Sequence, residues 1–242
     1  MTAIGIYGSL GRMGRTIADV IGDVGATNAG GADARDDCRP LAERADVLVD
    51  FSVASALPEH LEAARRAGTP ILIGTTGLSA RHHGLIDAAA AEIPVLQTGN
   101  TSLGVTLLSL LIREAAAKLG PEWDIEIVEM HHRHKVDAPS GTALMLGEAA
   151  AAGRGTALSE VRVDGRAGLT GARTEGTIGF SSLRGGSVIG EHMVVFATDG
   201  ERIELGHRGE DRVIFARGAV RAALWLKDQA PGRYRMGDVF GL

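Results

Sequence analysis

The sequence has a single cysteine, Cys38, which excludes an internal disulfide framework and a cysteine-rich metal site. It lacks any apolar run near the roughly eighteen residues that cross a membrane, and no basic leader precedes the first predicted strand. It also lacks an excess of positive charge: the formal net charge is −5, which argues against nucleic-acid binding. We therefore expect a cytoplasmic protein with no membrane or nucleic-acid partner.

Glycine, in contrast, is plentiful. The 34 glycines in 242 residues suggest many tight loops. The hydrophobic fraction of 45% is enough for a real core. This length allows one large domain or two small ones, and the chain contains no internal repeat or low-complexity segment.

The N-terminus predicts a strand, a glycine-rich turn and a helix. An apolar strand over residues 3–7 is followed by Gly8, Gly11 and Gly14, and a helix is predicted over residues 15–21. Dinucleotide-binding turns have the pattern G-x-G-x-x-G in this context, although Leu10 here replaces the middle glycine. The turn either approaches a pyrophosphate or is an ordinary connection between strand and helix.

Two charged residues after the second predicted strand bear on the choice of cofactor. Asp33 follows a strand over residues 27–32 and lies about twenty residues after the turn, where an acid can accept from a ribose hydroxyl. Arg35 could instead pair with a 2′-phosphate. Since both signals are present, the choice between NADH and NADPH stays open.

Strands and helices alternate through the first part of the chain. The alternation predicts an α/β fold with a Rossmann-type, doubly wound parallel sheet, and loops at the carboxyl ends of its strands gather at one edge. The Gly8 turn, Asp33, the Gly74 turn and the Thr98 turn should therefore share one rim. Further strands are predicted over residues 47–51, 70–73 and 94–97, helices over 54–67 and 79–91, and a polar link over 36–44.

The pattern changes after a long apolar helix over residues 103–119. A strand over 123–130, a helix after Ser140, an irregular loop over 153–171 and three more strand-like runs indicate a second α+β domain with a mostly antiparallel or mixed sheet. The later runs cover 176–183, 187–197 and 202–207, before a helix over 213–226 and a tail over 234–240. We expect residues 1–102 and 211–242 to form the dinucleotide-binding domain, and 103–210 the domain for substrate binding and oligomerisation.

A cluster of charged side chains lies between the strand over 123–130 and the helix that Ser140 is expected to cap. It reads Glu-Met-His-His-Arg-His-Lys-Val-Asp-Ala-Pro-Ser-Gly-Thr over residues 129–142. A solvated basic loop is one interpretation. A metal site is another, but the histidine spacing does not match common zinc patterns.

The third interpretation of the cluster is a site for a dianionic substrate that also needs a proton. Histidine titrates near neutrality and can deliver a proton, and Lys135 supplies a compact positive charge. Thr142 and the amide of Gly141, at a helix N-terminus, can hold a carboxylate.

These motifs resemble one family over nearly the whole chain: dihydrodipicolinate reductase, also called 4-hydroxy-tetrahydrodipicolinate reductase. The most specific part is E-x-H-H-R-H-K-V-D-A-P-S-G-T over residues 129–142. The segments that also fit are G-x-x-G-R-M-G at 8–14, Val-Asp-Phe-Ser at 49–52, Gly-Thr-Thr-Gly at 74–77, Asn100 with Ser-Leu-Gly-Val at 102–105, Gly-Glu-His at 190–192 and Met-Gly-Asp-Val at 236–239.

The resemblance implies roles for individual residues. His131 would be the proton donor or acceptor, Lys135 a second proton donor, and His132 a substrate contact, with Gly141 and Thr142 holding a substrate carboxylate. The cofactor would be lined by Gly8, Ser9, Leu10, Gly11, Arg12, Met13, Gly74, Thr75, Thr76, Thr98, Gly99, Asn100 and Thr101, in addition to Asp33 and Arg35.

The activity implied is reduction of 4-hydroxy-tetrahydrodipicolinate, a small cyclic dicarboxylate, with NADH or NADPH, in lysine and diaminopimelate biosynthesis. The resemblance also implies a homotetramer. Two alternatives remain: a related amino-acid-semialdehyde dehydrogenase, which the histidine-rich loop disfavours, and a non-catalytic nucleotide-sensing regulator, which the intact His131 and Lys135 disfavour.

Overall fold

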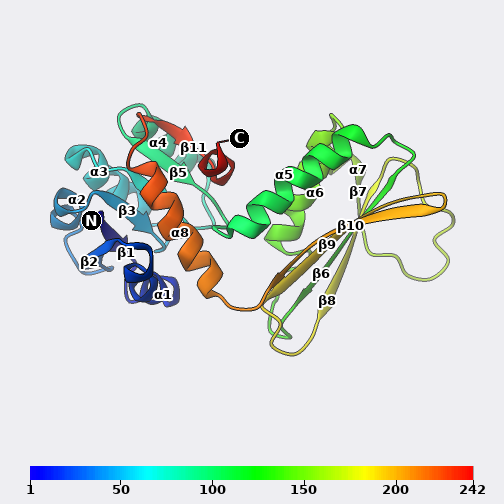
Figure 1. Cartoon of the computed structure of the whole chain (residues 1–242), viewed down its shortest axis with the longest axis horizontal. Helices are drawn as coiled ribbons and strands as arrows, with labels where there is room; N and C mark the ends of the chain where they lie inside the picture. Colours follow the sequence, from blue (N-terminus) through cyan, green and yellow to red (C-terminus); the bar gives the residue numbers. More distant parts are fainter. Residues whose placement is uncertain (242) are drawn as a thin grey trace. The chain divides into compact units, whose positions relative to one another are not determined.

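The computed structural model describes residues 1–241 and divides into two compact units, Met1–Leu103 with Val213 onward, and Gly104–Arg212 (Figure 1). Among the described residues, no helix has both the length and the apolar character needed to cross a membrane. The predicted fold class is confirmed, because the first unit contains a parallel sheet between helices and the second a separate mixed sheet.

The first unit is built on a six-stranded parallel sheet in the order β11-β5-β4-β3-β1-β2. The alternation of β1 explains its two buried faces, since Ile4 and Ile6 join one core and Tyr7 the other. The strands are β1 (Ala3–Tyr7), β2 (Thr27–Ala32), β3 (Val47–Asp50), β4 (Ile71–Ile73), β5 (Pro94–Gln97) and β11 (Gly232–Tyr234).

Helices cover both faces of this sheet. Residues of α1 and α8 fill one core, and residues of α2, α3 and α4 fill the other, which is the doubly wound arrangement. Their bounds are α1 (Arg12–Val20), α2 (Arg39–Arg44), α3 (Leu57–Ala67), α4 (Ala80–Ala90) and α8 (Val213–Leu226), with 3₁₀ turns η1 (Gly22–Val24) and η2 (Met236–Phe240).

Three details of the first unit differ from the sequence-based expectations. The link over residues 36–44 contains helix α2, with Pro40 in its first turn, where the missing N–H costs nothing. Helix α1 begins at Arg12 and not at Arg15, so Gly14 lies inside it. The expected C-terminal tail contributes the edge strand β11, which pairs in parallel with β5.

The second unit has a five-stranded sheet in the order β10-β9-β6-β8-β7. Its β6 is antiparallel to β9 but parallel to β8, because α6 forms a crossover between β6 and β8. Two of the four pairings are antiparallel and two are parallel, so the sheet is mixed, which is one of the two forms expected from the sequence. The strands are β6 (Asp124–His131), β7 (Arg162–Asp164), β8 (Ile178–Arg184), β9 (Gly190–Thr198) and β10 (Glu201–Gly209).

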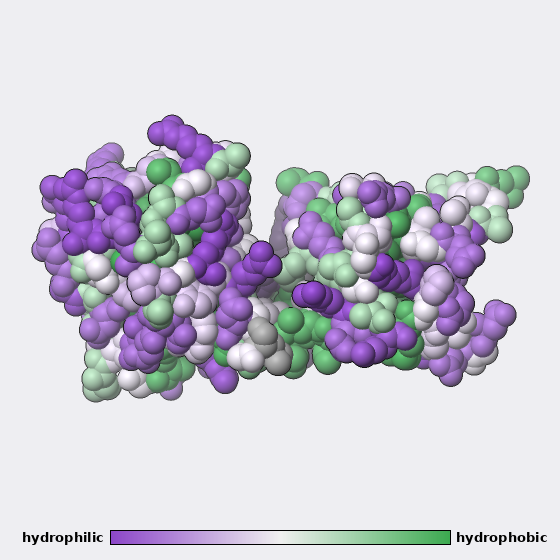
Figure 2. Space-filling view, turned by 90° about the horizontal axis from the view of Figure 1, so that it is seen from above, coloured by the Kyte–Doolittle hydropathy of each residue, from purple (hydrophilic) through white to green (hydrophobic). Residues whose placement is uncertain are grey.

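Two helices, α5 (Leu103–Lys118) and α6 (Gly141–Gly153), pack on one face of this sheet through a shared core with Ile127 and Phe196. The loop expected over residues 153–171 contains α7 (Leu158–Val161) and β7, which are too short to leave a clear periodic pattern. In the space-filling view, hydrophilic residues cover most of the visible first unit, and hydrophobic residues surface at several places on the second (Figure 2).

Candidate active site

A row of alternate residues on β6 leads from the core of the second unit into the charged loop. Ile125, Ile127, Glu129 and His131 are all buried, because every second residue of a strand faces the same side. The first two pack in the core under α5 and α6. The row therefore continues from two apolar side chains to a carboxylate and an imidazole.

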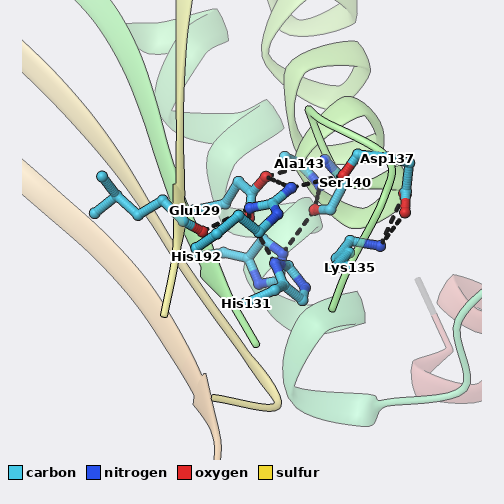
Figure 3. A network of polar contacts seen from close by, with 9 residues as sticks. Glu129, His131, Lys135, Asp137, Ser140, Ala143 and His192 are labelled. Carbon is cyan, nitrogen blue, oxygen red and sulfur yellow. Dashed lines mark hydrogen bonds and ion pairs between the residues drawn. The ribbon is translucent and has the colours of Figure 1, made fainter. Parts of the chain in front are cut away.

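The Glu129 carboxylate, 1% exposed, is surrounded by donors (Figure 3). Arg184 donates to both of its oxygens at 2.8 and 2.9 Å, the Ser140 amide donates at 3.3 Å, and Nδ1 of His131 lies 2.5 Å from Oε2. Burial alone would raise the pKa of this carboxyl, but the hydrogen bonds from Arg184 and His131 outweigh it and hold the pKa below its usual range. Glu129 is therefore a buried, charged acceptor.

A second histidine, His192, lies against His131. The ring of His192, opposite Glu129 in the strand register, meets the His131 ring edge-on at 5.1 Å. Its Nε2 lies 3.1 Å from Oγ of Ser140. Burial, with a smaller contribution from His131, lowers the pKa of His192 to about 4, so His192 is neutral at neutral pH.

The expected N-cap of α6 is confirmed, since Oγ of Ser140 accepts from the Ala143 amide at 3.1 Å. Gly141 and Thr142 form the first turn of this helix, where backbone N–H groups can bind an anion. His132 lies directly after β6 and is half-buried. The structure thus places the three expected substrate-binding residues at the two ends of the charged loop.

Lys135 lies within that loop and is paired with a residue that the sequence analysis did not single out. Its Nζ is 2.8 Å from both carboxylate oxygens of Asp137, and this hydrogen bond lowers the pKa of Asp137. Arg184 also donates to the Asp137 carbonyl at 2.6 Å. Arg184 therefore connects the loop to the buried Glu129. The loop also contains a cis peptide bond, Ala138–Pro139.

In the first unit, the glycine-rich turn between β1 and α1 is tightly folded. Gly8 has φ +79°, and a Cβ at this position would lie 2.7 Å from the Phe51 carbonyl oxygen. A Cβ at Gly14 would lie 2.3 Å from the Gly8 carbonyl oxygen. Helix α1 has no side-chain cap. The turn therefore has a tight geometry without a side-chain cap, in which backbone amides could approach a phosphate.

Asp33 lies beside this turn, as its place after β2 predicted. Its carboxylate accepts from Oγ of Ser9 at 2.6 Å and from the Leu10 amide at 3.2 Å. Arg12 and Arg35 are exposed. An acid at the turn and an exposed cation two residues later keep both forms of ribose recognition available.

A second buried carboxylate, Asp50, ties two loops of the same rim together. It accepts from the Ser52 hydroxyl at 2.6 Å and amide at 3.0 Å, and from the Thr75 hydroxyl at 2.9 Å, while Nδ1 of His60 lies 2.8 Å away. The His60 ring stacks on Tyr7 at 4.1 Å. The Thr75 hydroxyl thus faces Asp50, whereas Thr76 is exposed.

The loop after β5 is held by its own polar groups. Thr98 donates through its hydroxyl to the Asn100 carbonyl at 2.8 Å and accepts from the Asn100 amide at 3.1 Å. Thr101 donates to the Phe215 carbonyl at 2.7 Å. Because β1, β2, β4 and β5 are parallel, this loop shares one sheet edge with the Gly8 turn, Asp33 and Gly74.

Sequence reasoning quoted Glu129, His192 and Asp50 inside motifs but assigned them no role, and it missed Arg184 and His60. One signal was available for Glu129, since it lies among the alternate residues of β6 that face the core, where a charged residue needs a partner. Nothing local indicates that Arg184 supplies it. Within residues 1–241, no three His, Cys, Asp or Glu side chains are arranged to hold a metal ion.

The fold and the glycine-rich turn define the class: an α/β protein with a Rossmann-type unit and a second α+β unit, as in nicotinamide-dependent oxidoreductases. Residues 2–101 match the family described as dihydrodipicolinate reductase, N-terminus, and residues 104–240 match dihydrodipicolinate reductase, C-terminus. The chain therefore belongs to the dihydrodipicolinate reductase family.

Individual relatives agree with this assignment. The chain is 56% identical to a 4-hydroxy-tetrahydrodipicolinate reductase of Zymomonas mobilis, covering 99% of this chain and 97% of the relative. It is 50% identical to the one of Parvibaculum lavamentivorans, covering 98% and 97%. Among solved structures, dipicolinate-bound dihydrodipicolinate reductase from a Paenisporosarcina species has the same fold, with a TM-score of 0.78 at 23% identity and complete coverage of both chains.

Proposed function

We propose that this chain is an oxidoreductase that reduces 4-hydroxy-tetrahydrodipicolinate to tetrahydrodipicolinate with NADH or NADPH, in diaminopimelate and lysine biosynthesis. Family membership over both units, with relatives of the same name at 50% identity or more, supports the activity. The observation that carries the chemistry is the loop between β6 and α6, where a histidine, an ammonium and a helix N-terminus occur together.

The first unit would hold the nicotinamide cofactor at the carboxyl edge of its sheet. The tight turn at Gly8 and Gly14 fits a pyrophosphate, and Asp33 beside it fits a ribose. The bound cofactor supplies the hydride, and the protein positions the reactants and supplies the electrostatic field around them. The residues proposed to line it are Gly8, Ser9, Leu10, Gly11, Arg12, Met13, Asp33, Arg35, Gly74, Thr75, Thr76, Thr98, Gly99, Asn100 and Thr101.

The second unit would hold the substrate. Overall the reaction replaces the ring hydroxyl by hydrogen: one hydride and one proton are taken up, and the hydroxyl leaves as water. Hydride addition to an electrophilic carbon conjugated with C=N leaves negative charge that a nearby cation stabilises. His131 and Lys135 would supply protons and positive charge, while His132, Gly141 and Thr142 would contact the substrate and its carboxylate.

Lys135 starts from an ion pair in this scheme. Its ammonium is bonded to the Asp137 carboxylate and its side chain is 20% exposed. A dianionic substrate would compete with Asp137 for this ammonium, because a second carboxylate can bind the same donors. We therefore propose that Lys135 gives up at least one of its hydrogen bonds to Asp137 and forms one to the substrate.

We also propose a cytoplasmic homotetramer built through the second sheet. The face of that sheet away from α5 and α6 carries Val128, Met130, Leu183, Met193 and Val195, as their register with one another requires. Leu183 is 50% exposed. The same register places charged residues, among them Glu126, Glu191 and Glu204, beside these apolar side chains. A sheet face of this mixed character without a helix over it is a suitable subunit interface. Light scattering that gave a monomer mass at micromolar concentration would refute the tetramer.

A coupled assay tests the activity itself. Purified protein is mixed with NADPH or NADH and with substrate made in situ by the synthase that precedes this step, and absorbance at the nicotinamide band is followed. We expect oxidation of the nicotinamide that depends on both the synthase and this chain. Loss of absorbance without the synthase, or none with it, would contradict the proposal.

A further inference from the structure

Glu129 can only accept hydrogen bonds, and this fixes the proton on one side of the His131 ring. The carboxylate is buried, and two hydrogen bonds from the cationic Arg184 stabilise its negative charge, so it remains ionised. An ionised carboxylate has no proton to donate. Nδ1 of His131, 2.5 Å away, must therefore carry a hydrogen in both the neutral and the charged ring.

The other ring nitrogen of His131 is left open. Across residues 1–241 its Nε2 has no hydrogen-bonding partner, yet it is not among the polar atoms sealed from solvent. Gly190 keeps the space beside it clear, since a Cβ there would lie 3.0 Å from Nε2. The structure thus saturates one nitrogen of the ring and exposes the other.

Arg184 explains how Glu129 can serve His131. Removing a carboxylate from water is costly unless a cation and further donors compensate it. Arg184, opposite His131 in the strand register, reaches both Glu129 oxygens and also the Asp137 carbonyl of the loop. The same guanidinium therefore stabilises the charge of Glu129 and restrains the loop that carries Lys135.

We propose that Glu129, held by Arg184, is a positioning residue that fixes His131 with a proton on Nδ1 and presents Nε2 to the substrate. This inference rests on the proposed function. The hydride forms its bond to the electrophilic carbon and displaces a π-electron pair onto another substrate atom. The N–H bond at Nε2 of the charged ring breaks, and the proton joins the atom that received this pair. The ring stays neutral with its Nδ1 proton, Glu129 takes up none, and solvent reprotonates Nε2.

The test is Glu129→Gln, because an amide cannot satisfy the same partners. Glutamine offers one acceptor oxygen and one donor NH₂ group. If the oxygen serves Arg184, the NH₂ group faces Nδ1 of His131, which must then accept. Neutral His131 would move its proton to Nε2, and an Nε2–H group on a neutral ring cannot act as the acid.

Two measurements on this variant separate positioning from folding. Imidazole ¹⁵N chemical shifts distinguish the two tautomers without any substrate, with His131→Asn used to assign the signal. We expect wild-type His131 to be protonated on Nδ1 at high pH, and the variant on Nε2. We expect kcat of Glu129→Gln to fall on the order of 100-fold or more, with the Kd for NAD(P)H within about twofold. Glu129→Asp, which keeps two acceptor oxygens, should recover part of kcat.

Gly190→Ala is a second variant that leaves Glu129 and Arg184 in place. Its methyl group would crowd Nε2, so kcat should fall while the Nδ1 tautomer persists. A wild-type His131 protonated on Nε2, or a Glu129→Gln variant with kcat within about threefold of wild type, would overturn the positioning role. A wild-type chain that oxidises no NAD(P)H in the coupled assay would instead refute the proposed function, and with it only the catalytic half of this inference.

Discussion

Each of the two units contains a buried carboxylate bonded to Nδ1 of a histidine, yet the two pairs are built differently. Asp50 and His60 lie 2.8 Å apart in the first unit, and Glu129 and His131 lie 2.5 Å apart in the second. Both carboxylates are at most 1% exposed. Their remaining partners differ, since Asp50 accepts from hydroxyls and an amide, whereas Glu129 accepts mainly from the guanidinium of Arg184.

The orientation of the histidine rings differs as well. The His60 ring lies flat on Tyr7, with 18° between the planes, so its faces are used for packing. The His131 ring meets His192 edge-on, and its Nε2 reaches solvent. The Asp50 cluster therefore joins two loops, whereas the Glu129 cluster leaves Nε2 of His131 open to solvent. The same pair of groups can serve a scaffold or a reaction, depending on the other partners of the carboxylate and on the ring that packs against the histidine.

The largest expected difference between the two clusters is at Lys135, which lies beside the second cluster. Lys135→Ala should lower kcat by about 100-fold or more, because it removes the charge that we propose stabilises the transition state. Lys135→Met, which keeps the apolar stem, should do the same, and His131→Ala should also lower kcat. NAD(P)H affinity should stay near that of wild type. Steady-state kinetics with kcat within about twofold of wild type, and only a salt-dependent rise in KM, would show that Lys135 merely attracts the substrate.

Asp50→Asn should affect binding and stability, not the chemical step. The amide cannot accept from Ser52, Thr75 and His60 together, so we expect a loss of about 2 kcal/mol in the free energy of unfolding. NAD(P)H should bind about tenfold more weakly, since the loop at Thr75 is released. Urea unfolding and fluorescence titration measure both effects, with Asp19→Asn on the exposed side of α1 as control. Near-normal kcat at saturating cofactor supports the comparison, and a 100-fold loss of kcat contradicts it.

Acid should act on the second cluster through His192. Its pKa is lowered to about 4 in the folded protein, mainly by burial and then by His131, against about 6.5 in the unfolded chain. Between these values only the unfolded state takes up the proton, so this contribution to stability is present above pH 6.5 and is lost as the pH falls towards 4.

We expect wild type to lose roughly 2 kcal/mol more than His192→Gln between about pH 7 and pH 4.5. Glu129, His207 and Lys135 also face this ring and remain in both proteins. Denaturant titrations of both proteins at both pH values measure this difference. Identical losses in the two proteins would show that His192 does not contribute to the fall in stability.

Gly14→Ala tests the role of the first unit in cofactor binding. A methyl group there would lie 2.3 Å from the Gly8 carbonyl oxygen, so the turn must open and NAD(P)H should bind about tenfold more weakly. The control is Gly22→Ala, where an added Cβ has no neighbour within 4 Å. Unchanged affinity of Gly14→Ala would refute the role of the turn.

The smallest effect is expected at Arg35. Arg35→Ala should lower kcat/KM for NADPH by about fivefold, because one exposed charge contact with the 2′-phosphate is lost, and leave NADH unaffected. Arg221→Ala, exposed on α8, is the control. Equal losses with both cofactors would mean that Arg35 does not read the 2′-phosphate.

Local patterns predicted much of the fold because they depend on neighbours in sequence. The strand–turn–helix at Gly8, the alternating strands and helices, and the Ser140 cap all follow from spacing and residue type. Helix α2 was missed because its buried face consists only of Leu41 and Ala42. The parallel pairing of β6 with β8 depends on the crossover through α6, which only the tertiary structure reveals.

The partners within the two clusters were beyond local reasoning for the same reason. Arg184 lies 55 residues from Glu129, and Thr75 lies 25 residues from Asp50. A sequence identifies a buried charged residue by its position in the alternation of a strand. It does not say which distant side chain compensates that charge. The histidine-rich loop was found because its charged and titratable residues are contiguous in the sequence.

The first unit is assembled from two separated stretches of the chain, and this has a consequence for its synthesis on the ribosome. Helix α8 supplies Ala219, Val220 and Leu226 to the core on one face of the sheet, and β11 completes its edge. Both emerge after every residue of Gly104–Arg212. The inserted unit can therefore fold while the nascent sheet still exposes that apolar face, and the interval before α8 arrives is when the chain most needs protection from aggregation.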